Sequence, residues 1–182
     1  MDFNVIIALL LAGILSENYA LLHFLGTGAV IENERSSKKG LLVGLGTTII
    51  MVVCTLITWP LNKYLLSNVP YLQTLVFVVV LLVVVQLAHI FTKNRFEVYC
   101  KVDFIKFAIN GAVLGLCIHN THADFLTALI TAFSVGVGLT LTMVVFSTLK
   151  ERVDEEALPE SFRGLPIVLL IAGLMALVLL AF

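Results

Sequence analysis

The sequence predicts an all-α integral membrane protein of six transmembrane helices. They form two inverted three-helix repeats, and the first and fourth helices are broken near the membrane midplane. The composition, the long uncharged runs and an internal repeat support this fold class. Of the 182 residues, 60% are hydrophobic and 13% are charged, whereas soluble domains have about 45–50% apolar and about 25% charged residues. With a mean hydropathy of +1.07, the composition excludes water-soluble globular, disordered and nucleic-acid-binding proteins.

Stretches of about 20 apolar residues identify transmembrane helices in a sequence. We predict six of them in a single membrane domain, 1–182, at residues 3–31, 40–59, 71–91, 104–118, 125–149 and 165–182. Polar or proline-containing breaks separate them at residues 32–39, 60–70, 92–103, 119–124 and 150–164. All six should be helices, because a backbone in lipid must satisfy its hydrogen bonds internally.

The positive charges predict the orientation. The first, third and fifth breaks, with their edges, hold ten of the eleven Lys and Arg residues: Arg35, Lys38, Lys39, Lys93, Arg95, Lys101, Lys106, Lys150, Arg152 and Arg163. Only Lys63 lies on the other side. By the positive-inside rule the ten face the cytoplasm, so both termini face outward. The basic residues Lys38, Lys39, Lys150 and Arg152 are candidates for docking a soluble partner; the alternative is a solvated loop surface.

An internal repeat relates the two halves of the chain. Residues 44–53 resemble residues 136–145, with six of ten positions identical, and Gly28-Ala29-Val30 returns as Gly111-Ala112-Val113. Because the order is preserved, repeat 1 (about 1–92) matches repeat 2 (about 102–182). Each repeat has an odd number of spans, so the second must enter the membrane from the opposite side. Chance similarity between Gly-, Val- and Thr-rich segments is the alternative.

The first and fourth spans are the irregular pair. Residues 3–31 would reach about 43 Å as one helix, against a hydrocarbon core of about 30 Å, and the fourth span is short. Misfit segments at corresponding positions of inverted halves are typical of broken helices that meet near the midplane. The interruptions and the polar residues near them give the candidates for this functional centre: Glu17, Asn18, Gly26, Thr27, Gly28, Asn110 and Gly111.

A few side chains carry possible chemistry. Glu17 is the only acid well inside a span, where an ionised acid costs about 2.5–3.5 kcal/mol on insertion scales. It is either a cation or proton site or a structural carboxyl at a broken helix. A metal site at His119, His122 and Asp124 near Cys117 is conceivable, but short polar loops commonly collect such residues, and we predict no metal. Cys54 is interpreted as a small apolar filler, and no motif for soluble-substrate catalysis is present.

Over its whole length the sequence resembles a known family of six-helix membrane subunits. This family includes the A subunit of the Rnf complex and the E subunit of the Na⁺-translocating NADH:quinone reductase. The resemblance rests on residues 17–26, 37–39, 71–75, 84–86, 110–115, 151–152, 162–164 and 172–177 in this order and spacing. It implies a prokaryotic inner-membrane protein that pairs with a homologous sister subunit of opposite orientation, beside flavin- and ferredoxin-type subunits and membrane lipid.

The resemblance also implies an intramembrane [2Fe–2S] cluster, to which each sister contributes one cysteine from each broken helix. Here the sequence departs from the family. The family pattern Phe-Leu-Gly-x-Cys corresponds to Phe24-Leu25-Gly26-Thr27-Gly28, and Thr-Asn-Cys-Ala corresponds to Ile109-Asn110-Gly111-Ala112. Because glycine has no side chain to bind iron, which such clusters take from thiolates or imidazoles, we predict that this chain binds no cofactor itself. Flavin and iron–sulfur groups are then expected elsewhere in the complex.

Three functions remain open from the sequence. The first is a subunit of an ion-translocating electron-transport complex that carries electrons across the membrane with its sister, without ligating the cluster. The second is a small-molecule or ion transporter component, in which a midplane cavity and Glu17 bind the cargo. The third is a cluster-free scaffold subunit. The sequence favours the first.

Overall fold

The computed structural model describes residues 3–16, 37–66, 69–93, 110–153 and 159–180. In these residues every regular element is helical, which confirms the predicted all-α class. The α-helices are α1 (Phe3–Leu11), α3 (Ser37–Leu61), α4 (Pro70–Lys93), α7 (Gly111–His119), α8 (Phe125–Arg152) and α9 (Leu165–Leu180). Short π-helical turns follow α1 and α3 at η1 (Ala12–Ser16) and η2 (Asn62–Leu66), and 3₁₀ turns lie at η3 (Asn120–His122) and η4 (Glu160–Phe162).

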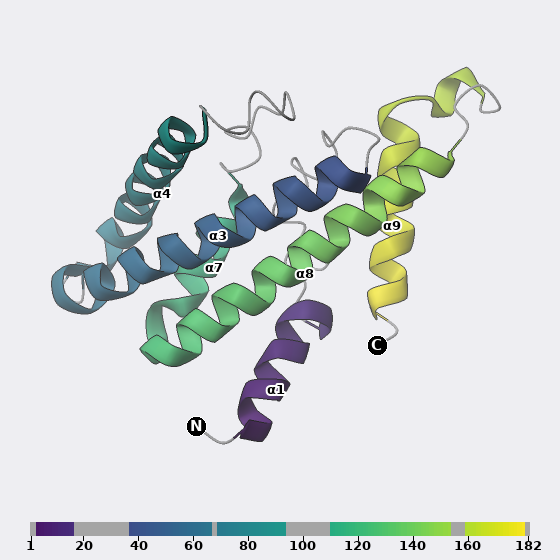
Figure 1. Cartoon of the computed structure of the whole chain (residues 1–182). Helices are drawn as coiled ribbons and strands as arrows, with labels where there is room; N and C mark the ends of the chain where they lie inside the picture. Colours follow the sequence, from purple (N-terminus) through teal and green to yellow (C-terminus); the bar gives the residue numbers. More distant parts are fainter. Residues whose placement is uncertain (1–2, 17–36, 67–68, 94–109, 154–158, 181–182) are drawn as a thin grey trace.

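Three helical stretches are long and apolar enough to cross a membrane: Gly40–Leu66, Tyr71–Ile90 and Phe125–Arg152. The shorter α9 has 16 residues and enters its first turn through Gly164, whose φ of 81° lies in the left-handed region that favours glycine. The helices α3 and α8 lie side by side, with α4 and α7 against α3 and with α1 and α9 against α8 (Figure 1).

The distribution of side chains on α3 is the reverse of that in a soluble helix. Its exposed positions include Leu45 and Ile49, at 50% and 65% exposure, whereas Thr55 and Thr58 are buried. The buried hydroxyls donate to backbone carbonyls one turn earlier, as from Thr55 to Met51 at 2.9 Å. Polar groups that bond within the helix bundle, with apolar groups outside, suit a lipid environment.

The most extensive helix contact is that between α3 and α8, and it contains a reciprocal seam. A Cβ atom added at Gly44 would lie 2.7 Å from the Thr140 Cα, and one added at Gly136 would lie 3.0 Å from the Thr48 Cα. The two threonine hydroxyls lie 3.0 Å apart and hydrogen-bond across the seam. Each hydroxyl also lies 2.9 Å from the carbonyl of the glycine four residues earlier in its own helix. Because a hydroxyl carries one proton, one threonine donates across the seam while the other donates to its own glycine carbonyl. We refer to these four residues as the Gly–Thr seam.

The pairing of residues in the seam shows that α3 and α8 run antiparallel, because the earlier residue of one helix meets the later residue of the other. The seam therefore joins the two segments that the sequence analysis matched as a repeat, and it joins them symmetrically. This symmetry supports the inverted arrangement, although the six-helix repeat as a whole extends beyond the described residues and stays a prediction.

The first helix crosses α8 at a second close contact. Gly13 fits directly against Ser134, and Gly138 fits against the backbone of Gly13 and Ile14. The Ser134 hydroxyl donates to the Leu10 carbonyl at 2.6 Å. The change from α-helix to π-helix at Ala12 shifts the backbone pairing by one residue, and the serine hydroxyl supplies a partner for a carbonyl at this transition.

Some predicted boundaries are wrong. The break expected at residues 60–70 begins later, because α3 continues through Pro60 to Leu61 and passes into η2. Proline removes only one backbone donor and tolerates the helical φ angle, and here it lies in the last turn. At the other end, α3 begins at Ser37, three residues before the apolar stretch, and α8 continues to Arg152, three residues beyond it. Polar residues thus extend helices that the hydropathy pattern alone would end.

Candidate functional site

The best-defined part of the predicted centre is the start of α7. Asn110 has an extended backbone (φ −126°, ψ 132°) and caps the helix, accepting at its Oδ1 atom a hydrogen bond from the Ala112 N–H at 2.9 Å. Asparagine is among the preferred N-cap residues because its side chain satisfies a backbone N–H that lacks a helical partner. Helix α7 therefore begins within the predicted segment 104–118, at the Asn110–Gly111 step. Residues 104–109 lie outside the described residues, so a break there stays a prediction.

The lengths of α7 and α3 indicate how far along α3 this cap lies. The nine residues of α7 span about 13.5 Å, less than half of the roughly 37 Å spanned by the 25 residues of α3. The turn after α7 is tied to the end of α3, because the Asn62 side chain donates to the Thr121 carbonyl at 3.0 Å. Since α7 packs against α3 and α4, we expect its first residue about halfway along α3, and its depth in a membrane stays a prediction.

The cap presents hydrogen-bond donors. Asn110 is 5% exposed, and its Nδ2 atom has no acceptor in the described part of the chain. A buried amide without a partner costs about 1–3 kcal/mol. Gly111, the first residue of α7, is exposed and has no side chain. A helix start also carries unpaired backbone N–H groups and a partial positive charge. The arrangement suits a group that accepts hydrogen bonds.

The two cysteines that the structure describes, Cys54 and Cys117, do not approach this point. Cys117 lies six residues after Gly111, about 9 Å further along α7, and it is packed near Cys54 of α3. Both thiols are free and buried: Cys117 is 4% exposed and Cys54 is 0% exposed. Cys54 is part of the hydrophobic core, in agreement with its interpretation as a small apolar filler.

The residues at the start of α7 do not fit a [2Fe–2S] cluster. Iron needs thiolate or imidazole ligands, and here Asn110 offers amide donors and Gly111 offers no side chain. Across the described ranges, no group of three His, Cys, Asp or Glu side chains is placed to hold a metal ion, and this includes the loop with His119, His122 and Asp124.

The other half of the predicted centre lies outside the described residues. Helix α1 and η1 are described up to Ser16, so Glu17, Asn18, Gly26, Thr27 and Gly28 have no structural account. The structure therefore brings together only Asn110 and Gly111 of the predicted midplane residues.

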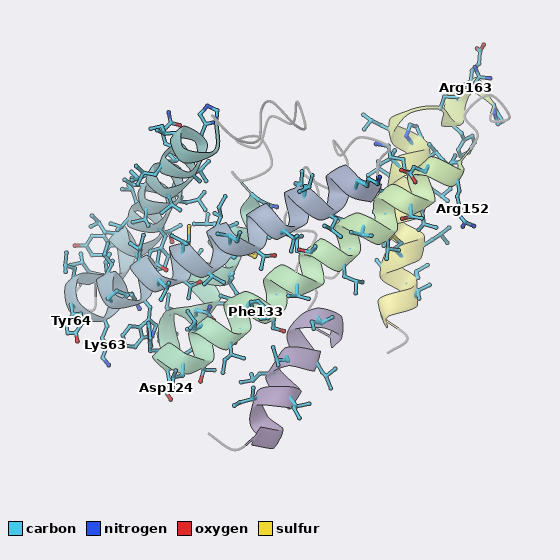
Figure 2. All side chains as sticks on the ribbon, viewed as in Figure 1. Lys63, Tyr64, Asp124, Phe133, Arg152 and Arg163 are labelled. Carbon is cyan, nitrogen blue, oxygen red and sulfur yellow. The ribbon has the colours of Figure 1, made fainter. Side chains whose placement is uncertain are left out.

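The candidate docking residues gather at one end of the molecule. The antiparallel packing places the start of α3, with Lys38 and Lys39, beside the end of α8, with Lys150 and Arg152. The Lys38 and Arg152 side chains are exposed, whereas Lys150 is half-buried. Figure 2 shows Arg152 and Arg163 at this end and Lys63, Tyr64 and Asp124 at the opposite end. This separation of charge agrees with the orientation predicted from the loops.

A pocket at the Lys63 end was not predicted. It has a volume of about 470 Å³ and lies between the end of α3, the start of α4 and the turn before α8. It is lined by Trp59, Asn62, Lys63, Leu66, Gln73, Thr121, His122, Ala123 and Asp124. The one available sequence signal was the isolation of Lys63 as the single positive charge on its side. The lining residues come from three separate segments, so no local motif marks them.

Long apolar helices, buried polar contacts between them and a short capped helix packed beside them define a polytopic helical membrane protein. The chain belongs to the family described as "Rnf-Nqr subunit, membrane protein", whose model matches residues 6–182.

Individual relatives agree with this family, and each is the A subunit of an ion-translocating oxidoreductase complex. The chain is 33% identical to the relative from Syntrophotalea carbinolica, over 97% of this chain and 95% of that protein. It is 31% identical to the relative from Sodalis glossinidius, over 98% and 96%. It is 32% identical to the relative from Escherichia coli (strain K12 / DH10B), over 93% and 91%. The resemblance found in the sequence is thereby confirmed over the whole chain.

Proposed function

We propose that this chain is a membrane subunit of an ion-translocating, Rnf-like electron-transport complex. Relatives that match nearly its full length are named as the A subunit of an ion-translocating oxidoreductase complex, and the family is one of membrane subunits. The chain has the apolar spans that such a subunit needs. Its place is in a prokaryotic inner membrane, with both termini outward, as the Lys and Arg distribution favours.

The start of α7 carries the more detailed proposal. This helix end combines a buried amide donor with an exposed, side-chain-free first residue. Both features are costly against lipid, where unsatisfied polar groups find no water. We therefore infer that a homologous sister subunit of opposite orientation covers this end. The flavin- and ferredoxin-type subunits are further partners in the same complex.

The hydrogen-bond donors at the start of α7 also indicate which kind of electron carrier fits there. Gly111 stands where the family pattern has a cysteine, so this chain contributes no thiolate at that position. Backbone N–H groups and the Asn110 amide suit the carbonyl oxygens of a flavin or quinone better than they suit a metal. The proposed role is to line the electron path and position a carrier there, while iron–sulfur groups are held by other subunits.

The first experiment is purification of the complex through a tag on this chain, followed by metal analysis and low-temperature paramagnetic resonance. Co-purifying flavin- and ferredoxin-type subunits are expected. Any reduced [2Fe–2S] signal should survive the Cys54→Ser and Cys117→Ser substitutions. A signal that disappears in either variant, with the sister subunit unchanged, would place iron ligands on this chain and overturn the cluster-free assignment.

The second experiment concerns Asn110. Asn110→Ser keeps an oxygen that caps α7 but removes the amide donors, so the complex should assemble while its ion-coupled electron transfer slows by about tenfold, the effect of about 1.4 kcal/mol. Ser161→Ala, at an exposed position of η4 outside this site, is the control for general effects of a substitution. Normal electron transfer in Asn110→Ser would show that the amide has no role in the carrier site.

A further inference from the structure

The pocket at the Lys63 end is held by contacts among three segments. The Trp59 indole N–H donates to the Ala123 carbonyl at 2.9 Å, and Asn62 donates to Thr121. Gln73 donates to the Asn62 Oδ1 atom at 2.8 Å. These bonds join α3, α4 and the turn before α8 without involving any charged side chain. The pocket is therefore pre-formed, and its charged groups are available to a ligand.

Two opposite charges remain at this pocket. The Lys63 ammonium lies 4.7 Å from the centre of the Trp59 ring, and that ring packs edge-on against Phe125 at 5.0 Å. Asp124 is exposed, and although it occupies the N-cap position of α8, its carboxylate makes no capping hydrogen bond. Within the described residues Lys63 and Asp124 form no ion pair with each other, and both point outward at the same end of the molecule (Figure 2).

The surroundings place the pocket at the membrane surface. It lies at the end of the apolar stretch Gly40–Leu66, and Trp59 is the chain's single tryptophan. Close by, Tyr64 and Tyr71 are 76% and 82% exposed. Tryptophan and tyrosine are enriched where a membrane meets water. Exposed Leu65 and Leu126, at 70% and 61%, provide apolar surface on which acyl chains can lie.

We propose that this pocket binds the headgroup of a zwitterionic phospholipid. The phosphate lies at the Lys63 ammonium, which lines the pocket. The ammonium lies at Asp124, and the acyl chains run along the apolar helix surface. A purely anionic ligand would meet the uncompensated Asp124 carboxylate, and a bare cation would meet Lys63. A headgroup that carries both signs satisfies both residues.

The test uses Trp59 as the reporter. The purified full-length chain is reconstituted into bilayers, and brominated phosphatidylethanolamine or brominated phosphatidylglycerol is added in increasing proportion. Bromine quenches the tryptophan when the lipid is in contact, so the curves give relative affinities. We expect a three- to fivefold preference for phosphatidylethanolamine, the range of one exposed ion pair. Equal affinities in the native chain would overturn the proposal.

Two substitutions separate the roles of the charges. Lys63→Gln should weaken both lipids by about three- to fivefold, whereas Asp124→Asn should abolish the preference between them. Lys38→Gln, at the opposite end of α3, is the matched control and should leave both affinities unchanged. An unaltered Trp59 emission maximum without brominated lipid shows that the pocket remains folded. Retention of the native preference in both pocket variants would refute the assignment.

A third measurement tests whether a water-soluble headgroup without acyl chains competes with the lipid. Millimolar glycerophosphoethanolamine should not relieve the quenching, because it lacks the acyl chains that hold a lipid at the surface. Relief of quenching at this concentration would assign the pocket to a water-soluble ligand instead. Quenching that vanishes in the assembled complex would show that a neighbouring subunit, rather than lipid, occupies the pocket.

Discussion

A single added methyl group in the Gly–Thr seam should separate α3 from α8. In Gly44→Ala the new Cβ would lie 2.7 Å from the Thr140 Cα, a backbone atom that no rotamer change can move. Reaching ordinary contact at about 3.4 Å requires the helices to part by about 0.7 Å. The hydrogen bond between the Thr48 and Thr140 hydroxyls, now 3.0 Å, would then lengthen to about 3.7 Å and be lost.

The cost of this change has two parts. Overpacking a well-packed contact costs about 1–3 kcal/mol, and an interhelical hydrogen bond in a membrane protein contributes about 0.6 kcal/mol. Alanine's higher helix propensity offsets up to about 1 kcal/mol of this loss, so we expect the free energy of unfolding to fall by about 1–2.5 kcal/mol. Equilibrium unfolding in mixed detergent micelles with increasing dodecyl sulfate, followed by circular dichroism, measures this value.

Gly173 offers the matched control. It lies on α9, is exposed, and an added Cβ there meets nothing within 4 Å. Gly173→Ala should be neutral or stabilising by up to about 1 kcal/mol, because alanine favours helix. Gly44→Ala with the same stability as Gly173→Ala would refute the reasoning.

The symmetry of the seam adds a sharper test. Gly136→Ala presses on Thr48 as Gly44→Ala presses on Thr140, and one separation of the helices relieves both. The double variant should therefore lose clearly less than the sum of the two single losses. Strict additivity would show that the two contacts respond independently, which a rigid helix pair does not allow.

Further predictions concern orientation and the first helix. A cysteine introduced at Lys63 should react with a membrane-impermeant thiol reagent added from outside, whereas one at Lys38 should not, and the reverse pattern would overturn both the orientation and the inverted-repeat proposal. Ser134→Ala removes the donor to the Leu10 carbonyl and should lower the free energy of unfolding by about 0.5–1.5 kcal/mol, measured as above. The same substitution at exposed Ser161 should change it by less than about 0.5 kcal/mol, and a Ser134→Ala effect this small would mean that the hydroxyl contributes nothing at the crossing.

The sequence predicted the long helices well, because an apolar run in lipid has few alternatives to a helix. It also placed an interruption at Asn110–Gly111, and α7 begins at this step, although the capping by Asn110 was not predicted. Pro60 was misjudged, because α3 ends directly after it but the backbone continues as the π-helical turn η2 rather than as a break. The π-helical turn at Ala12 was missed; it lies at the close crossing with α8, whose residues are far away in the chain.

The candidate site was predictable only where it is local. Asn110 and Gly111 are adjacent, so their pattern is visible in the sequence. The pocket joins Trp59, Gln73 and Asp124 from three segments, and only the packing of α3, α4 and the turn before α8 brings them together. The repeat was visible in the sequence as a similarity between two segments. The sequence did not show that the glycine of each copy packs against the threonine of the other copy.

The reciprocal contact between α3 and α8 is self-complementary: one surface, with a glycine and a threonine four residues later, fits a second copy of itself turned end for end. Such an isologous surface also satisfies a two-fold dimer. A single three-helix unit, inserted into the membrane in both orientations, would need only this one surface to make a homodimer. Once both copies are joined in one chain, the sequence of each copy of the surface can change independently of the other. Thr47 and Leu139, which follow the matching glycines at the same spacing and are both buried, already differ.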